Sequence, residues 1–130
     1  MRAVDTNVLV RFLTADDVAQ FRRARKVMEG GTVFVPKTVL LETEWVLRRA
    51  YALSRADISS TYEALAGAAE IELEDADAVL HALAWFRGGM DFADALHIAS
   101  RPNTAEFLTF DKQLISVAKK TGIKAVVQPD

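Results

Sequence analysis

The stretch TVFVPKTVLLETEWVLRRAY, residues 32–51, shows the pattern that decides the fold. Residues 32–35 have high strand propensity and are closed by Pro36, which cannot continue a central strand. From 37 to 51 the residues suit a long helix, with apolar side chains recurring at helical spacing. The stretch therefore predicts a buried strand followed by a helix, the repeating unit of a parallel sheet.

The same alternation extends outward to both ends of the chain. Further strands are expected at 2–4, 70–73, 106–109 and 124–127, and further helices at 8–13, 16–30, 54–68, 75–87, 90–100 and 111–121. This order predicts a three-layer α/β domain, with a central parallel sheet of about five short strands between helices. No linker or composition shift divides the chain, so residues 1–130 are expected to form a single domain.

Composition narrows the class of protein. Apolar residues make up 51% and charged residues 26% of the chain, as in globular proteins, and the absence of cysteine excludes disulfides, thiolate nucleophiles and cysteine-bound zinc. No uncharged apolar run is long enough for a membrane span, and Met1 precedes the first strand too closely for a signal peptide, so we expect a cytoplasmic protein. The net charge of −2 argues against a strongly basic nucleic-acid binder and leaves phosphate binding to a local patch.

Acidic residues gather where ligands of a parallel sheet bind, beyond the carboxyl ends of the strands. Asp5 ends the first strand, Glu42 lies in the second turn of the helix after the second strand, and Asp111 follows the fourth. Asp91 and Asp94 open the helix at 90–100. Converging carboxylates repel one another unless a cation neutralises them, and oxygen ligands select Mg²⁺ or Mn²⁺. The pattern predicts a metal site and favours phosphodiester hydrolysis.

Each aspartate also has a purely structural interpretation. Asp5, Asp91 and Asp111 stand where an N-cap is expected, and Asp94 would complement a helix dipole. For Asp91 the cap is the favoured interpretation, because Gly88-Gly89 ends the preceding helix just upstream.

Helical spacing leaves the role of Glu42 open, because Glu42 and Glu44 both have apolar neighbours along the helix. Leu41 and Trp45 form a second apolar stripe on this helix, which is either core or, as we favour, a surface for a partner.

Several basic residues are candidates for contact with substrate phosphate. His97 and Arg101 share a helix face with Asp94, but a packed or solvated His97 and an Arg101 at a helix C-terminus are favoured. The run Arg22-Arg23-Arg25-Lys26 is more typical of a solvated helix face than of an RNA track. The remaining candidates, which the sequence does not rank, are Arg11, Arg48 and Arg49.

Four stretches together resemble a known family. The stretches DTNVLVRFL (5–13), VLLETEWVLRR (39–49), DFADALHIA (91–99) and LTFDKQL (108–114) are similar to the successive motifs of PIN-domain ribonucleases. The resemblance is greatest to the VapC-type toxins of bacterial toxin–antitoxin pairs and covers essentially the whole chain.

The resemblance implies roles for individual residues. Asp5 matches the first metal ligand, Glu42 the second acid and Asp94 the third. Asp111 matches the fourth acid, whereas Glu44 matches no catalytic position. The supporting positions that it implies are Thr6, Asn7, Thr109 and Asp91.

The resemblance also implies a fold, a cofactor and partners. The fold would be a PIN-like α/β/α domain, and the cofactor Mg²⁺, with Mn²⁺ the other ion that fits. The partners would be an RNA substrate, a VapB-type antitoxin and a second copy of the chain, with no membrane. The expected function is that of a Mg²⁺-dependent endoribonuclease toxin.

Three other functions remain as hypotheses. These are a non-toxin PIN nuclease in RNA processing, a catalytically silent PIN binding module and a phosphoacceptor receiver domain. The last is disfavoured because Asp5 is followed by Thr6-Asn7 and not by a second acid.

Overall fold

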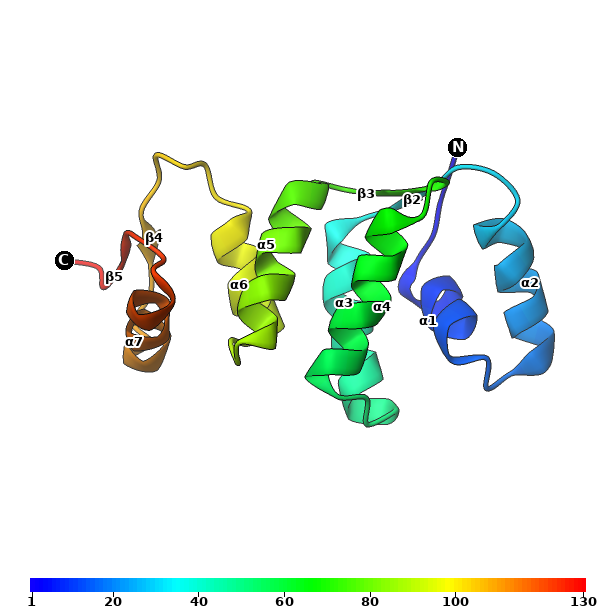
Figure 1. Ribbon diagram of the computed structural model, residues 1–130, viewed down its shortest axis with the longest axis horizontal. Helices are drawn as coiled ribbons and strands as arrows, with labels where there is room; N and C mark the ends of the chain where they lie inside the picture. The colour runs from blue at the N-terminus through cyan, green and yellow to red at the C-terminus, as the bar shows by residue number, and fades with distance from the viewer.

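The computed structural model describes residues 1–130 and contains every expected strand and helix in the expected order (Figure 1). The strands are β1 (Arg2–Ala3), β2 (Val33–Val35), β3 (Ile71–Leu73), β4 (Phe107–Leu108) and β5 (Val126–Val127). The helices are α1 (Thr6–Thr14), α2 (Val18–Met28), α3 (Lys37–Ala50), α4 (Arg55–Gly67), α5 (Ala76–Arg87), α6 (Phe92–Ala99) and α7 (Lys112–Thr121).

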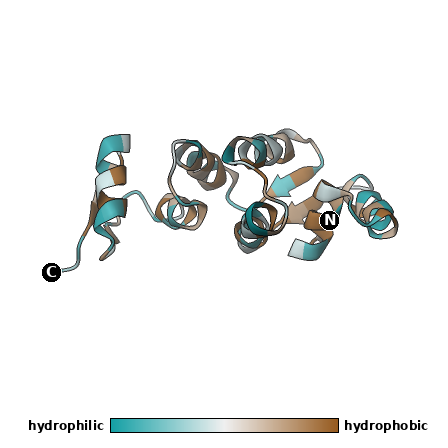
Figure 2. Cartoon of the chain, turned by 90° about the horizontal axis from the view of Figure 1, so that it is seen from below, coloured by the Kyte–Doolittle hydropathy of each residue, from teal (hydrophilic) through white to brown (hydrophobic).

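The first three strands form a parallel sheet in the order β1-β2-β3. Arg2 lies opposite Val33, and Val33 lies opposite Ile71. Parallel neighbours require crossover connections, which the intervening helices supply, and helices lie on both sides of these strands (Figure 2). The α/β class with a parallel sheet and helices around it is therefore confirmed, although the strands are short.

The last two strands pair only with each other, as a second parallel sheet of β4 and β5. Together with α7 they lie at one end of the molecule, whereas α2 lies at the other end (Figure 1). The strands thus form two sheets where one continuous sheet was expected. At this end of the molecule Leu108 of β4 is 56% exposed, and Phe110, which follows β4, is 80% exposed.

Arg101 accounts for the attachment of this second sheet to the end of α6. Its guanidinium donates hydrogen bonds to the backbone carbonyls of Lys124 at 2.6 Å, Ala125 at 3.0 Å and Ala105 at 3.2 Å. These carbonyls flank β4 and β5, so a single side chain fastens both strands to the helix that precedes them.

The apolar core is one cluster of 23 buried residues, and it includes Leu114 and Ala118 of α7. At its centre the Tyr62 hydroxyl donates to the Leu40 carbonyl at 2.6 Å, and the Tyr62 ring packs edge-on against Phe92. Because Phe92 is the first residue of α6, this packing fixes where that helix begins. No helix has both the length and the apolar character needed to cross a bilayer.

Candidate functional site

Asp5 lies where β1 passes into α1. Strand pairing continues up to the residue before it, since the N–H of Val4 donates to the carbonyl of Phe34 at 3.3 Å. The Asp5 side chain then accepts a hydrogen bond from the N–H of Val8 at 3.0 Å and caps α1. A cap of this kind uses one carboxylate oxygen. The other oxygen is left for a ligand, so the structural and chemical roles of Asp5 are compatible.

Glu42 lies on the exposed face of α3 and accepts a hydrogen bond from the hydroxyl of Thr6. This bond links the start of α1 to the second turn of α3. Asp5 and Asn7 line the same groove of about 590 Å³. The structure therefore brings together four of the predicted site residues, two acids and two polar neighbours.

Glu44 has a different environment, although it lies only two residues from Glu42. Its side chain is 3% exposed, and its carboxylate accepts a hydrogen bond from Nε of Arg48 at 2.8 Å. This hydrogen bond raises the pKa of Arg48. Glu44 is thus buried and paired with Arg48, whereas Glu42 is exposed and is the glutamate of this pair that lines the groove of Asp5.

Asp91 and Asp94 at the start of α6 differ in the same way. The Asp91 carboxylate accepts a hydrogen bond from the N–H of Asp94 at 3.1 Å, so the predicted N-cap is confirmed. Asp94 caps nothing and is half-buried. Burial, and then the negative charges of Asp91 and Asp111, raise the pKa of the Asp94 carboxyl, which the nearby His97 lowers only in part.

Asp111 caps α7 by accepting a hydrogen bond from the N–H of Leu114 at 3.0 Å. Its own N–H donates to the hydroxyl oxygen of Thr109 at 3.0 Å, which fixes the turn after β4. Asp111 lines a groove of about 270 Å³ together with Asp91 and Asp94. The acids of α6 and the acid at the start of α7 therefore form a second group.

The two groups of acids form a row and not a single cluster. Asp91, from the second group, also lines a groove beside Glu42 of the first, so the grooves adjoin. The structure brings Asp5 to Glu42 and Asp94 to Asp111, but it does not bring the two pairs together. No three acidic or histidine side chains lie close enough to hold one metal ion. The separation follows from the division of β1 and β4 between two sheets.

The row fits a divalent cation in its donor chemistry. All of its carboxylates offer oxygen ligands, which suit hard ions such as Mg²⁺ or Mn²⁺. Burial first, and then the charges of Asp91 and Asp111, raise the pKa of Asp94, and a cation bound beside it would lower that pKa.

Most of the basic candidates have partners within the protein. Arg101 holds backbone carbonyls, as described above, and His97 is exposed at the surface of α6. Three others are engaged by side chains: Arg11 with Asp16, Arg48 with Glu44, and Arg49 over the ring of Trp45 at 5.8 Å. On α2, Arg25 pairs with Glu29, whereas Arg22, Arg23 and Lys26 have no ion pair.

One residue beside the acids, Arg55 at the start of α4, was not among the residues predicted from the sequence. It lines the groove of Asp94 and Asp111. Its guanidinium donates to the carbonyls of Phe86 at 2.8 Å and Met90 at 2.7 Å, and it lies over the Phe86 ring at 4.6 Å. Arg55 thereby holds the turn that precedes Asp91. Since Arg55 is far from this turn along the chain, no local pattern could have revealed it.

Comparison with known proteins gives one match. The family model described as PIN domain matches residues 2–120, which includes every acid of the row. No curated protein and no solved structure matches the chain significantly.

Proposed function

This chain belongs to the PIN-domain family, and we propose that it is a Mg²⁺-dependent endoribonuclease acting as the toxin of a VapBC-type pair. Proteins of this family are generally metal-dependent nucleases, hydrolases that act on phosphodiester bonds. The observation that carries the proposal is the row of carboxylates along adjoining grooves, in which burial and neighbouring carboxylates raise the pKa of Asp94. The proposal treats residues 1–130 as one PIN domain.

In this proposal Asp5 and Asp94 would be the principal ligands of the ion, and Glu42 and Asp111 would complete the acidic set. Since the two pairs of acids lie apart in the structure, binding of the ion would have to draw them closer together. A bound Mg²⁺ supplies an activated water at neutral pH and stabilises the charge that develops on the phosphate. The Thr6 hydroxyl fixes the orientation of the Glu42 carboxylate. The remaining supporting residues are Asn7, Thr109 and Asp91.

The backbone of the chain adds to the attraction of phosphate at the row of acids. Helices α1, α6 and α7 all begin there, each capped by one of the aspartates. A helix N-terminus carries partial positive charge and free N–H groups, which favour a phosphate. These helix ends help an acidic row to accept an anionic substrate once a cation is bound.

The α3 surface beside the acids supports the proposed protein partners. Trp45 is 55% exposed and, with Leu41, lines the groove that contains Glu42. An exposed aromatic next to an active-site groove is typical of a protein interface. We therefore propose that an antitoxin segment covers this groove and that the chain forms homodimers, acting on RNA in the cytoplasm.

Alanine substitution of the two principal acids tests the activity. Asp5→Ala and Asp94→Ala are each expected to reduce the rate of Mg²⁺-dependent RNA cleavage by at least about 100-fold, while circular dichroism shows an intact fold. Asp77→Ala removes an exposed carboxylate of α5 and serves as a matched control with full activity. Full activity of a folded, nuclease-free preparation of Asp5→Ala or Asp94→Ala would overturn the assignment.

A catalytically silent binding module is the second candidate, and the absence of any group of three close acids favours it. Titration of Mn²⁺ into the wild type and Asp5→Asn distinguishes the two functions. If the protein is the nuclease, the wild type binds Mn²⁺ and Asp5→Asn binds it more weakly. A wild type that binds no Mn²⁺ and cleaves no RNA supports the silent module.

A further inference from the structure

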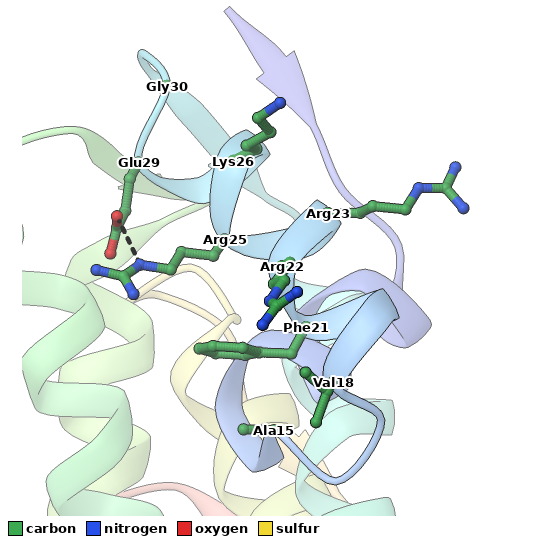
Figure 3. A pocket seen from close by; sticks show the side chains of 9 residues that line it. All are labelled: Ala15, Val18, Phe21, Arg22, Arg23, Arg25, Lys26, Glu29 and Gly30. Atoms are coloured by element: carbon green, nitrogen blue, oxygen red, sulfur yellow. Dashed lines mark hydrogen bonds and ion pairs between the residues drawn. The ribbon is translucent and has the colours of Figure 1, made fainter.

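Helix α2 carries a dense group of unpaired positive charge, which stands out in a chain of net charge −2. Arg25 is neutralised by Glu29 at 3.0 Å. Arg22, Arg23 and Lys26 are exposed and form no ion pair, and Figure 3 shows Arg23 and Lys26 extending outward from the helix. Local charge of this kind attracts polyanions even when the whole protein is acidic.

Apolar side chains line the same depression as these cations. Val18 and Phe21 contribute to a groove of about 1020 Å³ that also includes Arg22, Arg23 and Lys26 (Figure 3). Val18 is 60% exposed, and neither Val18 nor Phe21 packs against the apolar core. A helix face that merely contacts solvent needs no such apolar residues. Cations beside an accessible aromatic ring are the combination that binds single-stranded nucleic acid, because bases stack while phosphates pair.

This groove connects with the row of acids through two further depressions. Arg23 also lines a groove between α1 and α2, and that groove includes Asn7 and Arg11. Asn7 and Arg11 in turn line the groove that contains Asp5 and Glu42. A continuous track thus leads from the proposed site of cleavage, along α1, to the cations of α2.

We propose that the α2 groove binds the phosphate backbone of the RNA strand that flanks the scissile bond. The inference rests on the proposed ribonuclease function for its choice of polyanion. An acidic protein segment would also satisfy the cations, but the continuity of the track with Asp5 and Glu42 favours the substrate. Specificity for a long strand then comes from α2 and not from the acids.

The test is a triple variant, Arg22→Gln, Arg23→Gln and Lys26→Gln, compared with a control of equal charge change. The control is Lys119→Gln, Lys120→Gln and Lys124→Gln, on and just after α7 at the other end of the molecule (Figure 1). Binding of a fluorescent single-stranded RNA is measured by anisotropy in EDTA, so that no cleavage is required. The α2 variant is expected to bind the RNA about 10-fold or more weakly. The slope of the logarithm of the binding constant against the logarithm of the salt concentration should fall in magnitude by about 2, since each lost phosphate contact on a single strand lowers it by about 0.7.

Two further measurements make the outcome decisive. Phe21→Ala is expected to weaken binding about 5-fold or more through lost stacking, without loss of the fold. In cleavage assays the α2 variant should show a raised KM for long RNA and an unchanged kcat. Equal loss of affinity in the α2 and α7 variants would overturn the inference, as would α2 variants that lose binding of an acidic peptide while retaining RNA. Wild type that binds RNA through α2 but never cleaves it would refute the nuclease and leave the binding surface standing.

Discussion

The two halves of the acidic row are organised in opposite ways. In the N-terminal half, Asp5 caps α1 and a hydroxyl from Thr6 directly holds the carboxylate of Glu42. In the C-terminal half, Asp94 lies among other carboxylates, and burial together with their charge raises its pKa. Arg55 lines the same groove, but its guanidinium donates its hydrogen bonds to the carbonyls of Phe86 and Met90 and forms no ion pair with Asp94.

This difference indicates what each half needs in order to function. Thr6 orients an acid by a protein hydrogen bond, so the N-terminal half is prepared before any ligand arrives. The C-terminal half keeps an unfavourable burial of the charged Asp94 beside other carboxylates, which a bound cation would offset. We therefore expect cation binding to have its largest electrostatic effect at Asp94, and removal of a positioning hydroxyl to have its largest effect at Glu42.

The strongest test of this contrast replaces each positioning threonine by valine. Thr6→Val removes the hydrogen bond to Glu42 and is expected to reduce RNA cleavage about 10- to 100-fold. Thr109→Val removes only the hydrogen bond from the N–H of Asp111 and should reduce cleavage about threefold or less. Steady-state kinetics at saturating Mg²⁺ measure both effects.

The shape of valine is close to that of threonine, so both variants should fold. Unfolding in urea checks this. Equal loss of activity in Thr6→Val and Thr109→Val would show that the two halves are organised alike.

A smaller effect separates the helix cap from the chemistry in the C-terminal half. Asp91→Ala removes the hydrogen bond to the N–H of Asp94 and should lower the free energy of unfolding by about 1 kcal/mol. Asp91→Asn keeps a capping oxygen and should cost only a few tenths of that value, with RNA cleavage retained. Urea denaturation measures the free energy of unfolding of both variants. Asparagine and alanine variants of equal stability would contradict a capping role.

The sequence was sufficient to predict the order of the elements and several local contacts. Strands and helices follow from periodicity within each stretch, and even the short strand β3 appears where expected. The cap at Asp91 was also predicted, because a cap depends only on residues within one turn. These features share a local cause.

Features that depend on distant parts of the chain could not be predicted in the same way. The distinction between Glu42 and Glu44 required the positions of Thr6 and Arg48. The separate pairing of β4 and β5 depends on which strand edges meet, and a strand of two residues carries too little pattern to decide that. The pairing of the acids within the site follows from the same long-range choice.

The smallest expected effect is the pH dependence of stability that arises from Asp94. Its folded pKa lies above 3.8, so the folded state binds the proton more tightly than the unfolded state. The resulting contribution to the free energy of unfolding is present in full below pH 3.8, and it is lost as the pH rises through the raised pKa of Asp94 in the folded state. Asp94→Asn lacks the titration and should therefore gain stability over the wild type across this window. At neutral pH we expect a gain of roughly 0.5 kcal/mol or less, because Asp94 is only half-buried and solvent screens its carboxylate.

Urea unfolding of both proteins in EDTA, between about pH 3 and pH 7, measures this difference. Mg²⁺ should then stabilise the wild type more than Asp94→Asn, because only the wild type has the charge that the cation neutralises. Stability of the wild type that rises relative to Asp94→Asn with increasing pH would mean that Asp94 already has a compensating partner. The contrast between the two halves of the row would then fail at its C-terminal half.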